Sequence, residues 1–289
     1  MVDILGGGIL GGGAFRLAGV VGWPIDHSRS PILHRHWLDR YGIAGAYLPL
    51  PVEPAELPRL IRALPALGFA GCNVTLPHKT AVLPLLDYVE PEARRIASVN
   101  TIVVTPDGAL RGSSTDGFGF LENLRAAVPG WCAAAGPAVI AGAGGSARAV
   151  IAALAAAGVP EIRVINRTGR RAVALAEELD ASLQVWPWAA RSKALEGAAL
   201  LVNTTSQGMA GHPPLDLDLA GLPPAAIVAD LVYVPLLTPL LAVARDRGNP
   251  IVDGLGMLLH QARPGFEAWF GIAPPVDAAL RRAILASFR

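Results

Sequence analysis

A glycine-rich turn between a buried apolar run and a helix of small residues constrains the fold of this chain most. Residues 138–141 are apolar and residues 147–157 have a helical composition, and Gly142, Gly144 and Ala147 stand at the junction with G-x-G-x-x-A spacing. A second apolar stretch, residues 163–166, follows about 20 residues later, as the dinucleotide-binding fingerprint requires. This order predicts a parallel strand–helix–strand unit that binds a nucleotide. A plain glycine-rich turn is the alternative.

The end of the second strand indicates which dinucleotide would bind. NAD sites usually carry Asp or Glu there for the ribose 2′-hydroxyl. This chain has Asn166, Arg167 and Thr168 instead, followed by Arg170 and Arg171. Guanidinium groups suit the 2′-phosphate of NADP, and cations are unfavourable at a helix N-terminus unless an anion joins them. We therefore predict NADP rather than NAD; three solvated arginines are the alternative.

Strands and helices alternate along most of the 289 residues, which predicts an α/β fold with mainly parallel sheets. We expect strands at 18–22, 46–50, 69–74, 163–166, 200–203, 226–230 and 251–253, and a hairpin at 98–104 and 109–112. We expect helices at 32–41, 53–67, 120–127, 147–157, 170–179, 237–247, 257–270 and 276–288.

Composition excludes several functional classes. The 24 basic and 23 acidic side chains give a net charge of +1, so nothing favours nucleic acid or an anionic membrane surface. The 2 cysteines, Cys72 and Cys132, form neither a disulfide framework nor a metal motif, and we expect reduced thiols in the cytoplasm and no metal. The longest uncharged run, residues 126–147, is broken by Pro and Gly, which argues against a membrane span. Residues 1–14 are interpreted as a flexible leader, not a signal peptide.

One lysine stands out beside polar residues. Pro77 suits the first turn of a helix, so the sequence predicts a helix beginning there with Lys79 in that turn. The positive end of the helix dipole disfavours a cation, so such a lysine would lose its proton readily and could act as a general acid or base. A surface lysine that opens a helix is the alternative interpretation.

Short motifs along the chain carry a family resemblance. They are HSRSP at 27–31, NVTLPHK at 73–79, SVNT at 98–101, TDG at 115–117, GAGG at 142–145, NRT at 166–168, NTTSQGM at 203–209 and DGLGMLLHQA at 253–262. In this order they make the chain, from about residue 15 to its C-terminus, resemble the shikimate dehydrogenase family.

The resemblance implies an activity and a domain plan. The family reduces 3-dehydroshikimate to shikimate with NADPH, on the pathway to chorismate and the aromatic amino acids. Its plan would give an α/β substrate domain at residues 1–118, an inserted Rossmann domain that binds NADP at 119–254, and C-terminal helices at 255–289 that return to the substrate domain. A homodimer is allowed but not required.

The resemblance also assigns roles to single residues. Lys79 and Asp116 would be the catalytic pair at the oxygen that changes between ketone and alcohol. The expected substrate-binding residues are Ser28 and Ser30 for the carboxylate, Thr75, Asn100 and Gln261 for the ring hydroxyls, and Asn73 as a brace. The expected cofactor-binding residues are Gly142, Gly144, Gly145, Ser146, Ala147, Asn166, Arg167, Thr168, Arg171, Thr204, Ser206, Met209, Leu231, Tyr233, Gly254 and Met257.

Some positions depart from the family pattern. Ser114 stands where the family usually has Asn, which could loosen the turn that holds Asp116, and Ser146 replaces a common Ala. Two other functions stay open. One is a related dehydrogenase that uses quinate or an amino analogue, with NAD. The other is a non-catalytic binding protein on the same fold, against which the intact Lys79 and Asp116 argue.

Overall fold

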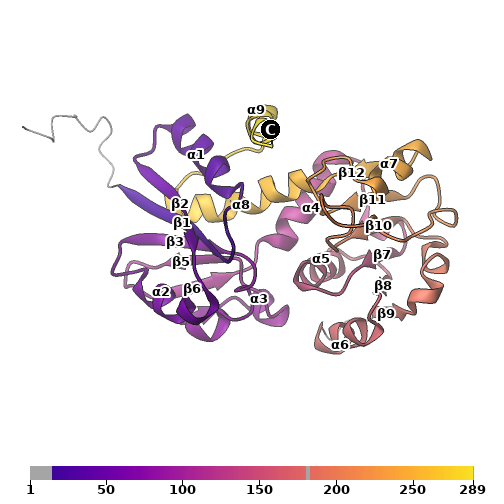
Figure 1. Ribbon diagram of the computed structural model, residues 1–289, viewed down its shortest axis with the longest axis horizontal. Helices are drawn as coiled ribbons and strands as arrows, with labels where there is room; N and C mark the ends of the chain where they lie inside the picture. Colours follow the sequence, from indigo (N-terminus) through magenta and orange to yellow (C-terminus); the bar gives the residue numbers. More distant parts are fainter. Residues whose placement is uncertain (1–14, 180–182, 289) are drawn as a thin grey trace, which may run out of the picture.

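The structure, a computed structural model, describes residues 15–179 and 183–288, so the predicted flexible leader lies outside the described residues. The described chain forms two six-stranded sheets, each with helices packed against it (Figure 1). This arrangement confirms the predicted α/β class with two parallel-rich sheets.

The first sheet has the strand order β2-β1-β3-β5-β6-β4. Its strands are β1 (Arg16–Gly22), β2 (Gly45–Pro51), β3 (Phe69–Val74), β4 (Tyr88–Val89), β5 (Thr101–Val104) and β6 (Leu110–Ser113). The strand β1 pairs in parallel with β2 and β3, whereas β5 and β6 form the predicted antiparallel hairpin. The parallel strands β1 and β3 therefore end at the same edge, from which polar loops follow.

The second sheet is parallel throughout, with the order β12-β11-β10-β7-β8-β9. Its strands are β7 (Ala138–Ala141), β8 (Ile162–Ile165), β9 (Leu183–Trp186), β10 (Leu200–Asn203), β11 (Ile227–Asp230) and β12 (Ile251–Val252). The chain runs outward from β7 to β9 and then returns to β10 on the other side of β7. Ligands bind at such a switch point, at the carboxyl ends of the strands.

Helices cover both sheets. They are α1 (Ser30–Tyr41), α2 (Leu57–Ala63), α3 (Pro91–Arg95), α4 (Asp116–Ala127), α5 (Gly145–Ala156), α6 (Gly169–Leu179), α7 (Pro239–Asp246), α8 (Gly254–Phe270) and α9 (Ala278–Ala286). Short 3-10 turns are η1 (Pro54–Glu56), η2 (Leu83–Leu85), η3 (Ala133–Ala135), η4 (Trp188–Ala190) and η5 (Lys193–Leu195).

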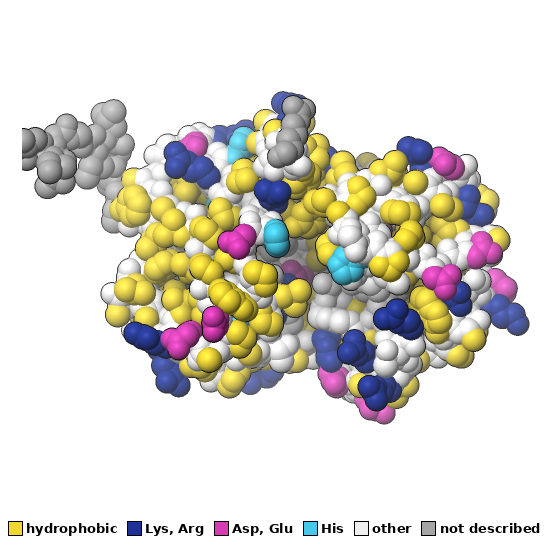
Figure 2. Space-filling view, in the orientation of Figure 1, with side chains coloured by type: hydrophobic (Ala, Val, Ile, Leu, Met, Phe, Trp, Pro, Cys, Tyr) yellow, Lys and Arg dark blue, Asp and Glu magenta, His cyan; other side chains and the backbone are white. Residues whose placement is uncertain are grey.

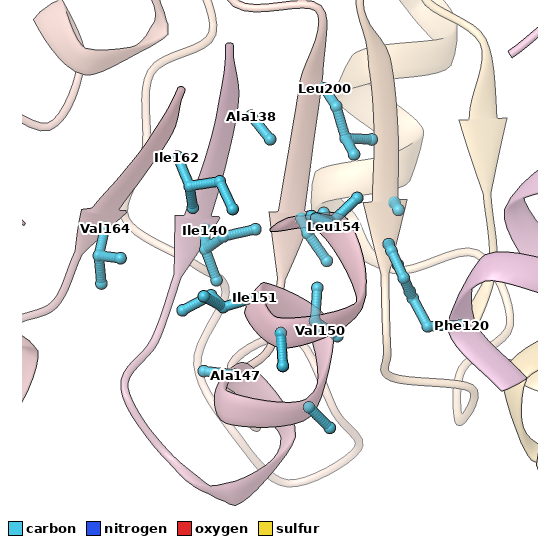
Figure 3. Packing of buried hydrophobic residues seen from close by; sticks show 14 of the residues in the cluster. Phe120, Ala138, Ile140, Ala147, Val150, Ile151, Leu154, Ile162, Val164 and Leu200 are labelled. Carbon is cyan, nitrogen blue, oxygen red and sulfur yellow. The ribbon is translucent and has the colours of Figure 1, made fainter. Parts of the chain in front are cut away.

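The helix α5 packs on the second sheet through small and branched side chains. Val150, Ile151 and Leu154 of this helix are fully buried against Ile140 and Val164 of the strands (Figure 3). This packing fixes the glycine turn, because the turn connects two elements that are both held by the same core.

The long helix α8 returns the C-terminal part of the chain to the first sheet (Figure 1). Its Trp269 is buried and donates from Nε1 to the Ile102 carbonyl oxygen at 2.9 Å. Gly71 has φ +151°, and a Cβ there would lie 2.1 Å from that carbonyl oxygen and 2.3 Å from Trp269 Nε1. Only glycine at this position lets the helix approach the sheet so closely.

The main error of the sequence prediction is the helix expected at Pro77. Residues 75–82 form turns, in which the His78 amide donates to the Thr75 carbonyl. The Lys79 carbonyl accepts from the Val99 amide at 2.9 Å, a partner distant in sequence, and no helix includes Lys79. No dipole of a helix that begins at Pro77 therefore acts on Lys79, and that prediction is wrong.

Other differences concern boundaries and short elements. The predicted helix at 53–67 is η1 followed by the shorter α2, and α4 begins at Asp116, ahead of the predicted residue 120. The short elements β4, α3 and β9 were not predicted.

Candidate active site

A cleft of about 580 Å³ opens between the two sheets. Each sheet with the helices packed on it forms one lobe of the molecule, and Figure 2 shows the surface hollowed between the two lobes. All of the residues predicted to bind substrate or catalyse its reaction line it: Ser28, Ser30, Asn73, Thr75, Lys79, Asn100, Asp116 and Gln261. They come from the end of β3, from the loops after β1 and β3, from the residue before β5, from the starts of α1 and α4, and from α8. On the side of the second sheet, Ser146 comes from the start of α5, and Leu231 and Tyr233 come from the loop after β11. Gly254 and Met257 follow at the start of α8.

Lys79 and Asp116 form an ion pair in this cleft. The Lys79 Nζ donates to Asp116 Oδ2 at 2.5 Å, and the two side chains are 22% and 9% exposed. Asp116 is the first residue of α4, where the helix dipole favours a carboxylate. The pair thus places one ammonium group, still reachable from the cleft, beside a carboxylate that holds its orientation.

Asn100 connects the members of the site. Its Nδ2 donates to Asp116 Oδ1 at 2.8 Å and lies 3.2 Å from Gln261 Oε1, and its Oδ1 accepts from the Thr115 amide at 2.8 Å. Thr115 was not predicted, although it lies in the TDG motif; its hydroxyl donates to the Gln261 carbonyl at 2.8 Å. The network fixes Asp116 and Gln261 against each other across two elements distant in sequence.

Asn73 belongs to the same network of hydrogen bonds. Its Oδ1 accepts from the Tyr47 hydroxyl at 2.6 Å, and its Nδ2 donates to the Asn100 carbonyl at 3.0 Å. Both ends of the amide are thereby occupied by protein partners, and the bracing role stays a prediction. Tyr47 is a supporting residue that the sequence did not reveal, because nothing in its strand marks it as different from a core aromatic.

Ser114, the departure from the family pattern, lies two residues before Asp116. Its hydroxyl is buried and has no hydrogen-bond partner among the described residues. Asp116 keeps its bonds to Asn100 and Lys79 nonetheless. The substitution therefore leaves the predicted catalytic carboxylate held by its neighbours.

The two serines of the HSRSP motif face the cleft beside the start of α1. Ser30 is the first residue of this helix and is 7% exposed, and its amide lies 3.4 Å from Ser28 Oγ. Helix N-termini with hydroxyls attract carboxylates, because the free amides and the dipole favour negative charge. Arg29 between the serines, together with His27 and Trp23, also lines the cleft; these three were not predicted.

The glycine turn after β7 leaves room for a phosphate. The helix α5 begins at Gly145 without a side-chain cap, and a Cβ on Gly144 or Gly145 would meet nothing within 4 Å. Gly142 has φ +120°, and a Cβ there would lie 2.4 Å from Thr204 Oγ1, which donates to the Ala141 carbonyl. Free helix amides facing open space fit a pyrophosphate.

The residues after β8 fit a further phosphate. The Asn166 side chain donates to the Thr168 carbonyl at 2.8 Å and shapes the turn that leads into α6. Among residues 15–179 and 183–288, Arg167, Arg170 and Arg171 form no ion pair. Cations without an acidic partner at a helix start fit an anionic ligand group.

The remaining predicted cofactor residues lie at the same edge of the second sheet. Ser206 and Met209 are in the loop that follows β10, and Met209 is 38% exposed. Gly254 lies so near this edge that a Cβ would be 2.2 Å from the Leu231 carbonyl oxygen. The glycine lets the loop after β11 contact the start of α8, which brings Tyr233 into the cleft wall.

Asp230, which the sequence did not single out, holds that loop. Its carboxylate accepts from the Val232 amide at 3.0 Å, from Thr238 Oγ1 at 2.7 Å and from Asn203 Nδ2 at 3.0 Å. Burial raises the pKa of Asp230 to about 6. The loop that carries Leu231 and Tyr233 is therefore ordered by a buried carboxyl group.

The described residues contain neither a metal-binding cluster nor a membrane-spanning helix. No three His, Cys, Asp or Glu side chains of the described chain cluster closely enough to hold a metal ion. No helix within the described ranges is long and apolar enough to cross a membrane.

Comparisons with known proteins match most of the chain. The family model of the shikimate dehydrogenase substrate binding domain matches residues 20–102, that of shikimate/quinate 5-dehydrogenase matches 132–210, and that of the shikimate 5′-dehydrogenase C-terminal domain matches 254–284. A curated shikimate dehydrogenase (NADP(+)) from Paramagnetospirillum magneticum is 61% identical over 273 residues, which are 94% of this chain and 99% of the relative. The chain belongs to the shikimate dehydrogenase family.

Solved structures of this family have the same fold. A shikimate 5-dehydrogenase from Thermus thermophilus in complex with NADP(H) and shikimate matches with a TM-score of 0.84 and 38% identity, over 94% of this chain and 99% of that one. A quinate dehydrogenase from Corynebacterium glutamicum in complex with NAD matches with a TM-score of 0.88 and 33% identity, over 94% and 100%. Shikimate and quinate dehydrogenases thus share one fold, and residues of the site must decide between their substrates.

Proposed function

We propose that this protein catalyses the reversible reduction of 3-dehydroshikimate to shikimate with NADPH, in the pathway to the aromatic amino acids. The observation that carries the proposal is the Lys79–Asp116 ion pair at 2.5 Å in a cleft lined by hydroxyl and amide side chains. The curated relative of 61% identity carries the same activity in its name.

The chemistry requires a proton donor beside a ketone. When bound, NADPH supplies a hydride to the carbonyl carbon. The Lys79 Nζ then gives a proton to the oxygen, so that an alcohol forms and the ammonium becomes an amine. Positive charge at this position also stabilises the negative charge that develops on the oxygen. In the reverse direction the amine of Lys79 takes the proton back.

Asp116 orients this proton transfer. Its Oδ2 accepts from Lys79 and its Oδ1 accepts from Asn100, so the carboxylate is held on both sides. A carboxylate fixed in this way can also accept a hydrogen bond from a hydroxyl next to the reacting carbon. Asn100 and Gln261 offer further amide groups to the ring hydroxyls. A site built to bind hydroxyls rejects analogues that lack them.

The remaining groups of the substrate and of the cofactor are assigned to residues that lie at suitable places in the fold. Ser28 and Ser30 at the start of α1 would bind the carboxylate, and Thr75 at the end of β3 would bind a ring hydroxyl. The glycine turn would hold the pyrophosphate of NADP, and Arg167 and Arg171 its 2′-phosphate. Tyr233, Gly254 and Met257, which line the cleft, would lie near the nicotinamide.

The proposal includes the predicted division at residues 118 and 254, a cytoplasmic location and the possibility of a homodimer. The turnover assay uses purified protein with shikimate and NADP and follows the absorbance of the reduced nicotinamide. Steady production of NADPH supports the proposal, and the absence of turnover with both substrates present in excess overturns it.

Quinate dehydrogenase activity is the second candidate, because the fold of this chain matches that of the solved quinate dehydrogenase with a TM-score of 0.88. That protein was solved with NAD, whereas Arg167 and Arg171 here favour NADP. Its substrate differs from shikimate in the ring, so activity with quinate in the same assay would support this candidate.

A further inference from the structure

The C-terminal helix α9 is fastened to both lobes of the molecule. At its start, Asp277 caps the helix and accepts from Arg40 of α1 at 2.5 Å. Further along, Arg281 donates to Asp253 at 2.5 Å, and Asp253 is the N-cap of α8, where the chain leaves the second sheet. In Figure 1, α9 lies above the middle of the molecule, between the two lobes. These two bonds fix the position of α9, and with it the position of the residues that follow the helix.

Phe288, just after α9, touches one residue from each lobe. Its ring centroid lies 6.0 Å from that of Tyr233, with an interplanar angle of 26°. The second residue is Arg29, whose Cζ lies 5.4 Å from the Phe288 ring centroid in a cation–π contact. Tyr233 belongs to the loop after β11 of the second sheet, and Arg29 belongs to the loop after β1 of the first.

Both partners of Phe288 line the cleft, whereas Phe288 itself does not. Arg29 lies between Ser28 and Ser30, the proposed carboxylate ligands. Arg29 forms no ion pair with any acidic side chain that the structure describes. Burial raises the pKa of Tyr233, and the positive charge of Arg29 partly offsets that rise. The two side chains are therefore close enough to interact electrostatically.

We propose that Phe288 is a positioning residue for substrate binding: its ring holds the Arg29 guanidinium and the Tyr233 ring at the cleft wall, where the guanidinium binds the substrate carboxylate. This inference rests on the proposed function. An arginine side chain has many rotamers, and ordering it on binding costs affinity. A ring that already holds the guanidinium removes part of that cost, so the C-terminal segment contributes to substrate recognition without touching substrate.

The test compares wild type with Phe288→Ala, Phe288→Tyr and the matched control Leu285→Ala. Leu285 is on α9 and packs partly buried against the core of the first lobe. We expect Phe288→Ala to raise the KM for shikimate about tenfold, from the loss of the cation–π contact that holds Arg29, with kcat changed less than about twofold. Phe288→Tyr keeps the ring and should keep the KM, and Leu285→Ala should lower thermal stability but leave the KM unchanged.

A double-mutant cycle identifies the route of the effect. Arg29→Ala and Phe288→Ala should not be additive, because Phe288 acts through Arg29: the double variant should have nearly the KM of Arg29→Ala alone. Additive effects, or a KM for Phe288→Ala equal to that of Leu285→Ala, would overturn the inference. Calorimetric titration of shikimate into the same variants gives the dissociation constants without turnover.

The two proposals fail in different ways. Inactive wild-type protein refutes the proposed function. Active wild-type protein whose shikimate affinity is insensitive to Phe288→Ala refutes only the role of Phe288. Wild-type protein that does not bind shikimate at all refutes both.

Discussion

Replacing Lys79 separates its chemical role from its structural role. Lys79→Met removes the ammonium group and keeps most of the side-chain volume, and Lys79→Arg keeps the positive charge. Because Lys79 is the proposed proton donor, both variants should lose kcat by about 10²- to 10⁴-fold, the usual contribution of a general acid. A guanidinium does not give up its proton near neutral pH, so charge alone should not restore turnover.

The two variants should differ in stability. In Lys79→Met, the Asp116 carboxylate, 9% exposed, loses the charged hydrogen bond at 2.5 Å and keeps the bond from Asn100. A hydrogen bond to a charged group contributes about 1.5–3 kcal/mol, and the 22% exposure of Lys79 puts the expected loss at the lower end. Lys79→Arg should retain most of this stability, since a cation still faces Asp116.

The assay combines steady-state kinetics with urea unfolding of wild type and both variants. The expected pattern is low kcat in both, a shikimate KM within a few-fold of wild type, and reduced stability in Lys79→Met alone. Turnover within tenfold of wild type in either variant would refute the proton-donor role. A large rise in KM with normal kcat would make Lys79 a binding residue instead.

Three further predictions follow from single features of the structure. The double variant Arg167→Ala/Arg171→Ala should raise the KM for NADP by roughly 10- to 100-fold, since charge-assisted bonds to a phosphate are lost, and leave the KM for NAD unchanged; an equal effect on both cofactors in the nicotinamide assay would contradict it. Gly71→Ala should destabilise the protein by about 3 kcal/mol or more in urea unfolding, because Gly71 has φ +151° and a Cβ there would lie 2.1 Å from the Ile102 carbonyl oxygen. An unfolding midpoint equal to that of wild type would show that α8 can shift at no cost. Burial lowers the pKa of His34 from 6.5 to about 3, so below pH 6.5 the unfolded chain binds a proton that the folded protein excludes, and the free energy of unfolding should fall by about 1.4 kcal/mol per pH unit from about pH 6 toward 3. Asp230, whose folded pKa is raised to about 6, acts in the opposite sense between pH 4 and 6. The wild type is therefore compared with His34→Phe, which should lack the His34 contribution, and parallel pH profiles for the two proteins would refute the prediction.

The parts of this fold that depend on local pattern were predictable. The apolar runs placed β3 and β10 at the residues where they are found, because each is a short buried strand between breakers. The glycine spacing predicted the turn between β7 and α5, since few other backbones need glycine at those positions. The residues predicted to bind substrate or catalyse the reaction all line one cleft, because strand ends of an α/β sheet meet at one edge and α8 brings Gln261 to the same place.

The parts that depend on contacts distant in sequence were not predictable. Lys79 was expected in a helix, but its carbonyl is taken by Val99, a partner that only the folded sheet brings near. Tyr47 supports Asn73 from another strand, and Asp230 orders a loop through Thr238 and Asn203. Phe288 lies beside Arg29 and Tyr233 at the end of α9, a helix whose position depends on the bonds of Asp277 to Arg40 and of Arg281 to Asp253. No periodicity or motif marks such partners in one sequence.

The specificity of turnover tests the central claim most directly. The initial rates would be measured with shikimate and with quinate, each against NADP and against NAD, at matched concentrations. We predict fast reduction of NADP by shikimate and far slower reaction in the other three combinations. Comparable rates with quinate or with NAD would contradict the assignment of the cleft to shikimate and of Arg167 and Arg171 to the 2′-phosphate, and no reaction in any combination would contradict the enzyme itself.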